Sequence, residues 1–99
     1  AFEWYTRAAR QDHDESQSKL GFLYALGRGV QKDFKQANYW FRQSADSGNK
    51  DAQFNLGVSY EHGYGVQQNT DTALEWYSKA CGNGNDKGCA VYQKLSSER

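Results

Sequence analysis

Three tryptophans recur in this chain at a constant interval of 36 residues, at Trp4, Trp40 and Trp76. Other residues keep the same period. The residues Leu20, Gly21, Tyr24, Gly27, Gly29, Val30 and Ala37 return as Leu56, Gly57, Tyr60, Gly63, Gly65, Val66 and Ala73. A period between 20 and 50 residues is typical of stacked supersecondary units, each too small to bury its own apolar face. The period therefore predicts an array of one unit copied head to tail.

Composition agrees with a thin, elongated stack and excludes two classes of partner. The 99 residues are enough for one domain, and 15% of them are aromatic although the mean hydropathy is −0.99. Twelve basic and twelve acidic residues give a net charge of zero, which argues against nucleic acid as a partner. No apolar stretch approaches the roughly 20 residues that cross a bilayer, so we expect no membrane insertion.

The first half of each unit has the pattern of a helix. Ala52, Leu56 and Tyr60 stand at i, i+4 and i+8 with Gly57 beside them, which makes one packing stripe. The preceding unit has the same stripe at Ser16, Leu20 and Tyr24, with Gly21 alongside. We predict first helices over 15–26 and 51–62, and expect another helix backbone to approach the two glycines closely.

The second half of each unit predicts another helix. Asp33 and Asn69 occupy one phase and are good N-caps, so we expect second helices over 34–46 and 70–81. The tryptophans fall on the inward stripe of these helices and should act as core wedges, with Trp4 the most exposed. Eight of the ten glycines form four phase-matched pairs, at 21/57, 27/63, 29/65 and 48/84. Their GxG pieces read as helix ends, because a phosphate loop needs a preceding strand.

The ends of the chain hold half units. Residues 1–11 match a second helix alone, so the chain resembles a fragment that opens inside a repeat. Units follow at 12–47 and 48–83, and 84–99 reads as a capping helix with a polar tail typical of a natural C-terminus. The prediction is an all-α, α/α solenoid of about five antiparallel helices in a single domain, 1–99.

The pattern Leu20-Gly21-x-x-Tyr24-x-x-Gly27-x-Gly29-Val30, continued by Asp33, Ala37 and Trp40, resembles the Sel-one-like repeat. This family is related to the tetratricopeptide repeat. The resemblance implies a right-handed α/α superhelix that acts as a non-enzymatic adaptor and holds a protein or peptide partner without a cofactor.

Cys81 and Cys89 resemble the disulfide arrangement of the bacterial cysteine-rich members, although only this last junction has it; the equivalent positions are Ala45 and Gln53 one unit earlier. Between two antiparallel helices a bridge would close a small loop, worth roughly 2.5 kcal/mol, and would indicate a periplasmic or secreted protein. The alternative is a pair of reduced, buried thiols, which would leave a cytoplasmic location open. No CxxC motif is present, and His13 and His62 are too far away in sequence to complete a zinc site, so we expect no metal.

Two further motifs have weak chemical readings. Ser16 and Lys19 spell SxxK, a motif of penicillin-recognising enzymes, but neither SDN nor KTG follows and Ser16 falls at the packing phase. Some cysteine-rich relatives have been linked to penicillin binding, so a β-lactamase-like hydrolase remains an alternative function. The acidic cluster from Asp12 to Glu15 lacks the ligand ladder of a calcium loop and reads as a solvated turn before a helix.

A binding groove is expected on the face of the first helices opposite their packing stripe, because in related repeats these helices line the concave side. We name as candidates Lys19, Phe22, Phe54, Asn55, Val58, Glu61, His62 and Lys94. Phe22, Phe54 and Val58 are apolar where a solvated helix should be polar; the alternative is that they pack against the second helix of their own unit. Tyr64, at the tip of a GxG loop, is a secondary candidate. A third reading of the whole chain is a structural spacer that binds nothing.

Overall fold

The computed structural model describes residues 2–9 and 14–98, so expectations that concern Asp12 and His13 lie outside it. The described residues form helices and no strand, which confirms the all-α fold class. The helices are α1 (Phe2–Ala9), α2 (Asp14–Leu26), α3 (Phe34–Asp46), α4 (Lys50–His62), α5 (Thr70–Gly82) and α6 (Asp86–Ser97). These are six helices rather than about five, because two full units supply four and each half unit supplies one.

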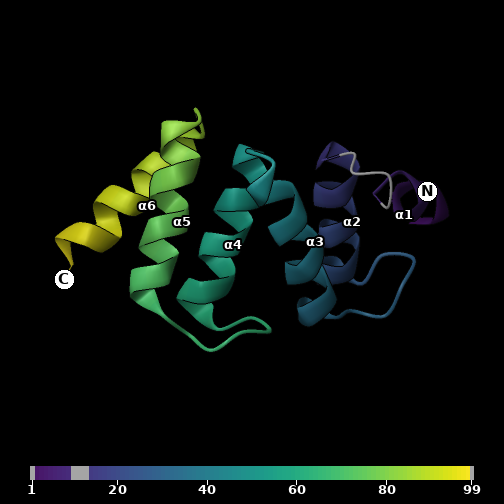
Figure 1. Cartoon of the computed structure of the whole chain (residues 1–99). Helices are drawn as coiled ribbons and strands as arrows, with labels where there is room; N and C mark the ends of the chain where they lie inside the picture. The colour runs from purple at the N-terminus through teal and green to yellow at the C-terminus, as the bar shows by residue number, and fades with distance from the viewer. Residues whose placement is uncertain (1, 10–13, 99) are drawn as a thin grey trace.

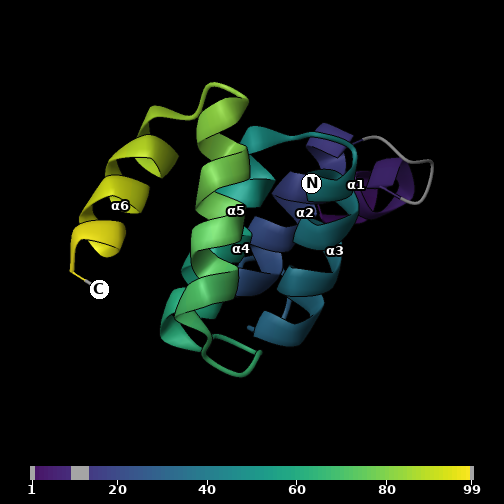
Figure 2. The same ribbon diagram turned by 60° about the vertical axis from the view of Figure 1, so that its left-hand side comes forward.

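The helices stack in chain order along a molecule that measures 42 × 24 × 16 Å. Each helix packs against its neighbours in sequence, and Figure 1 shows the succession from α1 at one end to α6 at the other. In Figure 2 α3 and α5 lie on the near side, with α2 and α4 behind them. We call α2, α4 and α6 the first helices, and α1, α3 and α5 the second helices. The structure is thus a solenoid whose two kinds of helix line different sides.

The capping residues that the sequence indicates begin and end the helices. The side chain of Asp33 accepts hydrogen bonds from the backbone N–H groups of Lys35 and Gln36 at the start of α3. Asn69 does the same for Thr72 in α5. Gly63 ends α4 in the left-handed conformation, with φ of 76°, which favours a residue without a Cβ.

The glycines inside the first helices make room for an aromatic ring. A Cβ on Gly57 would lie 2.6 Å from Cε1 of Tyr77, and one on Gly21 would lie 2.7 Å from the ring of Phe41. The expected close approach of a helix backbone is confirmed at Gly21, where the Cβ would also lie 3.0 Å from the carbonyl oxygen of Ala37 in α3. At Gly57 the three nearest atoms all belong to the ring of Tyr77, so a side chain of the second helix fills the space there.

The tryptophans at one phase have three different environments. Trp76 is buried at 7% exposure within the core cluster, as expected of a wedge between units. Trp40 is half-buried, and Trp4 is the most exposed of the three at 63%. The guanidinium carbon of Arg42 lies 5.2 Å from the centroid of the Trp76 ring, and the Nζ of Lys79 lies 4.5 Å from it. At these distances the ring attracts both cations through cation–π interactions.

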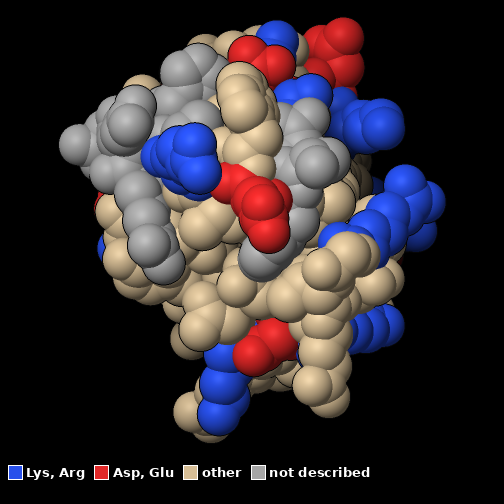
Figure 3. Space-filling model, turned by 90° about the vertical axis from the view of Figure 1, so that its right-hand side faces the viewer, with Lys and Arg blue, Asp and Glu red and all other residues tan. Residues whose placement is uncertain are grey.

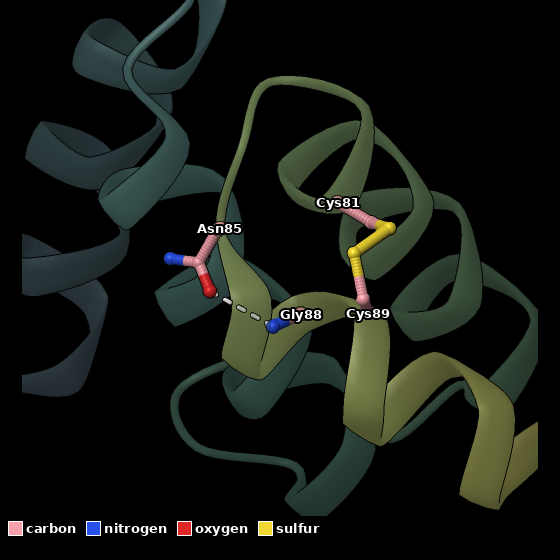
Figure 4. Close-up of a disulfide and its surroundings, with 4 residues drawn as sticks. All are labelled: Cys81, Asn85, Gly88 and Cys89. Carbon is pink, nitrogen blue, oxygen red and sulfur yellow. Dashed lines mark hydrogen bonds between the residues drawn. A yellow bond between two sulfur atoms is a disulfide. The ribbon is translucent and has the colours of Figure 1, made fainter.

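A disulfide between Cys81 and Cys89 joins α5 to α6, which confirms the bridge (Figure 4). Beside it, Gly88 packs α6 closely on α5, since a Cβ there would lie 3.0 Å from Cβ of Ala80. One unit earlier the same junction has a hydrogen bond instead: Nε2 of the buried Gln53 donates to the carbonyl oxygen of Ala45 at 3.1 Å. Equivalent junctions between units are thus held by a disulfide in one case and by a hydrogen bond in the other.

Candidate functional site

A groove with about 840 Å³ of free space crosses the three first helices near their N-terminal ends. From here on, the groove means the hollow lined by Asp14, Glu15, Ser18, Lys19 and Phe22 of α2, by Asn49, Asp51, Phe54 and Asn55 at and within the start of α4, and by Asn85 and Lys87 at the start of α6. Lys19, Phe22, Phe54 and Asn55 are the sequence candidates that it brings together. Each full unit and the capping helix therefore contribute to one surface.

Two aromatic rings give the groove its apolar lining. Phe22 packs edge-on against Phe41 with ring centroids 5.6 Å apart, and Phe54 packs against Tyr77 at 5.5 Å. Phe22 nevertheless remains 43% exposed and Phe54 is half-buried. Each ring thus packs against the second helix of its own unit and also lines the groove.

Asn49 and Asn85 tie the first helices together along the rim. Oδ1 of each caps its own helix, accepting from the N–H of Ala52 and of Gly88. Nδ2 of Asn49 donates to Oδ2 of Asp14 at 3.4 Å, and Nδ2 of Asn85 donates to Oδ1 of Asp51 at 3.1 Å. Neither asparagine is among the sequence candidates, although their spacing of one full period is a signal that could have found them.

Asn55 holds a donor that the fold itself does not use. Its Nδ2 is buried and has no hydrogen-bond partner within the part of the chain that the structure describes. Leaving such a donor unpaired costs about 1–3 kcal/mol, so most buried amides find an acceptor. Asn55 lines the groove beside Phe54, so rotation of its side chain would bring this buried donor to an acceptor on a ligand.

Four sequence candidates lie outside the groove. Glu61 accepts a hydrogen bond from the hydroxyl of Tyr77 at 2.6 Å, and His62 stacks on Tyr64 with centroids 5.3 Å apart. Val58 is half-buried, and Lys94 is exposed on α6. Tyr64 is exposed as expected, and its other stacking partner is Phe34 at 4.9 Å.

The Tyr77–Glu61 pair makes stability sensitive to alkaline pH. Burial, the hydrogen bond to Glu61 and the charge of that carboxylate raise the pKa of Tyr77 well above its usual value. The unfolded chain loses this proton near pH 10, while the folded protein keeps it. Folding stability from this group is therefore present below about pH 10 and is lost as the pH rises further.

We expect Tyr77→Phe to flatten this alkaline loss, since phenylalanine carries no proton. Urea unfolding between pH 9 and pH 12 would measure it, and the slope for the native protein should be steeper by up to about 1.4 kcal/mol per pH unit. Phe41, one period earlier, shows that the position accepts phenylalanine. Parallel slopes for the two proteins would show that Tyr77 ionises as easily in the fold as outside it.

The SxxK motif is unsuited to an acylating enzyme. Ser16 is 1% exposed on the packing side of α2, whereas a nucleophile must be reached by its substrate. Lys19 points to solvent and lies 3.8 Å from the carboxylate of Glu15. In addition, no group of three or more His, Cys, Asp or Glu side chains among the described residues is placed so that it could hold a metal ion.

Membrane-spanning helices and surface charge are the two remaining expectations from composition. None of the helices in the described part of the chain combines the length and apolar character needed to cross a bilayer. On the end face that carries the N-terminus, acidic side chains lie among the basic ones (Figure 3). This mixture agrees with the balanced charge of the sequence.

Comparison with known proteins gives a consistent result. A sequence profile of the Sel1 repeat matches residues 1–13, 14–49 and 50–85. A Sel1 repeat protein from Oxalobacter formigenes is 39% identical, with a TM-score of 0.90 over 93% of this chain and 69% of that one. The protective antigen c5321 of uropathogenic Escherichia coli, which displays the same repeat fold, is 36% identical with a TM-score of 0.92 over 95% of this chain. The present chain covers 20% of that longer protein.

A third solved structure is the cysteine-rich protein B of Helicobacter pylori, 26% identical with a TM-score of 0.87, over 91% of this chain and 68% of that protein. A search of curated protein sequences gives no significant match. The matches therefore cover nearly the whole chain and agree on one repeat and one fold.

Proposed function

The chain belongs to the Sel1 repeat family, whose modules typically mediate protein interactions, and on that premise we propose that its groove binds an extended peptide segment of a partner protein. The binding is non-enzymatic, and the first helices α2, α4 and α6 together provide the surface. The observation that carries the proposal is the unpaired, buried Nδ2 of Asn55 beside the exposed ring of Phe22 and the half-buried ring of Phe54.

The chemistry of the groove suits a peptide better than a small apolar ligand. An extended peptide presents a carbonyl oxygen at every residue, and Asn55 Nδ2 supplies the matching donor. Phe22 and Phe54 offer apolar contact for a side chain of the peptide. The groove crosses two repeats and the cap, which suits an extended chain segment.

The same proposal includes a compartment outside the cytoplasm. Disulfides persist in oxidising environments such as a bacterial periplasm or the secreted state, and Cys81 and Cys89 are joined here. Bacterial proteins with the same fold include the cysteine-rich Helicobacter pylori protein. We therefore place the domain in the periplasm or outside the cell, where its partner would also be found.

Asn55→Ala separates binding from folding. The probes are peptides selected on the native domain from a display library of random 12-residue peptides. We expect Asn55→Ala to bind them roughly fivefold more weakly than the native domain does, because one hydrogen bond contributes about 1 kcal/mol. Its melting temperature should stay unchanged or rise, since no partner within the fold loses a bond. Fluorescence anisotropy with the selected peptides and thermal melts by circular dichroism would measure the two quantities.

Gln43→Ala serves as the matched control, because Gln43 is an exposed amide on α3 outside the groove. It should leave both affinity and melting temperature unchanged. The proposed function would be contradicted if no peptide of the library bound the native domain, or if Asn55→Ala bound the selected peptides with unchanged affinity.

A further inference from the structure

We infer that the groove is electrostatically polarised along its length and selects a peptide segment of opposite polarity, with a cationic side chain over α2 and α4 and an anionic group over α6. The inference rests on the proposed function and adds the chemical class of the peptide. It comes from the sign of the charges that each first helix brings to the groove.

One repeat phase shows the change of sign directly. Residues 15, 51 and 87 occupy the same position in successive first helices, and all three line the groove. They are Glu15 in α2, Asp51 in α4 and Lys87 in α6. Because equivalent positions in a stacked array face the same side, the charge on one side of the groove turns from negative to positive between α4 and α6.

The neighbouring groups reinforce the negative half. Asp14 adds a third carboxylate to the lining of the groove. The only cation that lines the groove from α2 is Lys19, and its Nζ lies 3.8 Å from the carboxylate of Glu15. That ammonium therefore offsets Glu15, while Asp14 and Asp51 are contacted by neutral asparagine amides that leave their charge in place.

The positive half belongs to the capping helix. Lys87 lines the groove from the first turn of α6. Lys94 lies outside the groove, two helical turns further along the same face of α6. In the first two units the positions equivalent to Lys94 hold Phe22 and Val58, which are uncharged. The disulfide at Cys89 fixes α6, and with it Lys87, to α5.

The repeat spacing sets the distance between the charges of the peptide. Both α4 and α6 pack on α5, and packed helices lie about 8–10 Å apart, so these two first helices are separated by roughly 10–20 Å. An extended chain advances about 3.3 Å per residue, so a cation and an anion roughly three to six residues apart would reach the α4 and α6 parts of the groove together. An apolar residue between them would lie near Phe54.

Selection from a library of random 12-residue peptides tests the inference with three proteins: the native domain, Lys87→Glu and the control Lys35→Glu. Lys35 is an exposed residue of α3 outside the groove, so both variants carry the same change in net charge. An acidic residue in the first turn of α6 is compatible with the helix dipole, and circular dichroism would verify that both variants fold. The native domain and Lys35→Glu should enrich peptides with a cation and an anion in the stated spacing, and Lys87→Glu should enrich peptides with two cations.

Synthetic peptides then measure the size of the effect. Replacing the anion of the best native binder by its neutral amide should weaken binding to the native domain on the order of fivefold at low salt and leave binding to Lys87→Glu no weaker. Enriched peptides without this charge pattern, or the same peptides from all three proteins, would overturn the polarity while leaving groove binding intact. Absence of any enriched peptide would overturn the proposed function itself.

Discussion

Trp76→Ala is expected to lower the free energy of unfolding by about 3–5 kcal/mol, the usual cost of removing a large aromatic side chain from a core. Trp76 is 7% exposed and belongs to the cluster that contains Phe41 and Leu56. It therefore contributes to the packing between one unit and the next. Domains of this size have a total stability of about 5–15 kcal/mol, so the variant should be close to unfolding at room temperature. Urea titration followed by circular dichroism would measure the change.

Trp4→Ala is the matched control, because it removes the same side chain at the same repeat phase. Trp4 is 63% exposed, so we expect a loss below about 1 kcal/mol, the usual range for surface positions. Trp40, which is half-buried, should give an intermediate value. Equal losses at all three positions would contradict the assignment of Trp76 as a buried wedge.

Cys81→Ser with Cys89→Ser is expected to cost roughly 2.5 kcal/mol, from the chain entropy that the small closed loop removes from the unfolded state. The effect should concentrate on α6, because Gly88 is the only buried residue within that helix. Other helices bury four or five residues each from α2 to α5. Without the bridge, α6 has little apolar burial to hold it against α5.

Hydrogen exchange would locate this loss as well as measure it. Amides of α6 should exchange faster in the double serine variant, while those of α2 and α3 change little. Reducing the native protein with dithiothreitol should reproduce the result, since it breaks the same bond. Uniform acceleration over all helices would instead show that the disulfide stabilises the whole stack. Because Asn85 and Lys87 line the groove, the loosened variant should also bind its peptide more weakly.

The fold could be predicted closely from the sequence because its signals are local and repeated. The caps Asp33 and Asn69 and the helix-ending Gly63 act within a few residues, so their phase alone sets the helix bounds. The nature of the close approach at Gly57 could not be predicted in the same way. A glycine shows that space is needed, but only packing shows whether a ring or a backbone fills it.

Only part of the groove could be predicted. Repeat phase tells which side of a helix a side chain faces, but it does not tell where along the helix the surface is hollowed. Phe54 and Asn55 lie in the N-terminal half of α4 and Phe22 lies just past the middle of α2, where the groove is formed. Glu61 shares a helix with two of them but lies near its other end, where the hydroxyl of Tyr77 binds it. That hydroxyl is absent from Phe41 in the preceding unit, so the pairing is not a property of the repeat.

The central claim is that the first helices form a peptide-binding groove, and mapping a bound peptide by nuclear magnetic resonance tests it most directly. The native domain, labelled with ¹⁵N, would be titrated with the best peptide from the library selection. The groove predicts that the largest amide shifts fall on Ser18, Phe22, Phe54 and Asn55, with smaller ones at Lys87. Shifts centred on the exposed faces of α3 and α5, such as Tyr39 and Gln43, would contradict it.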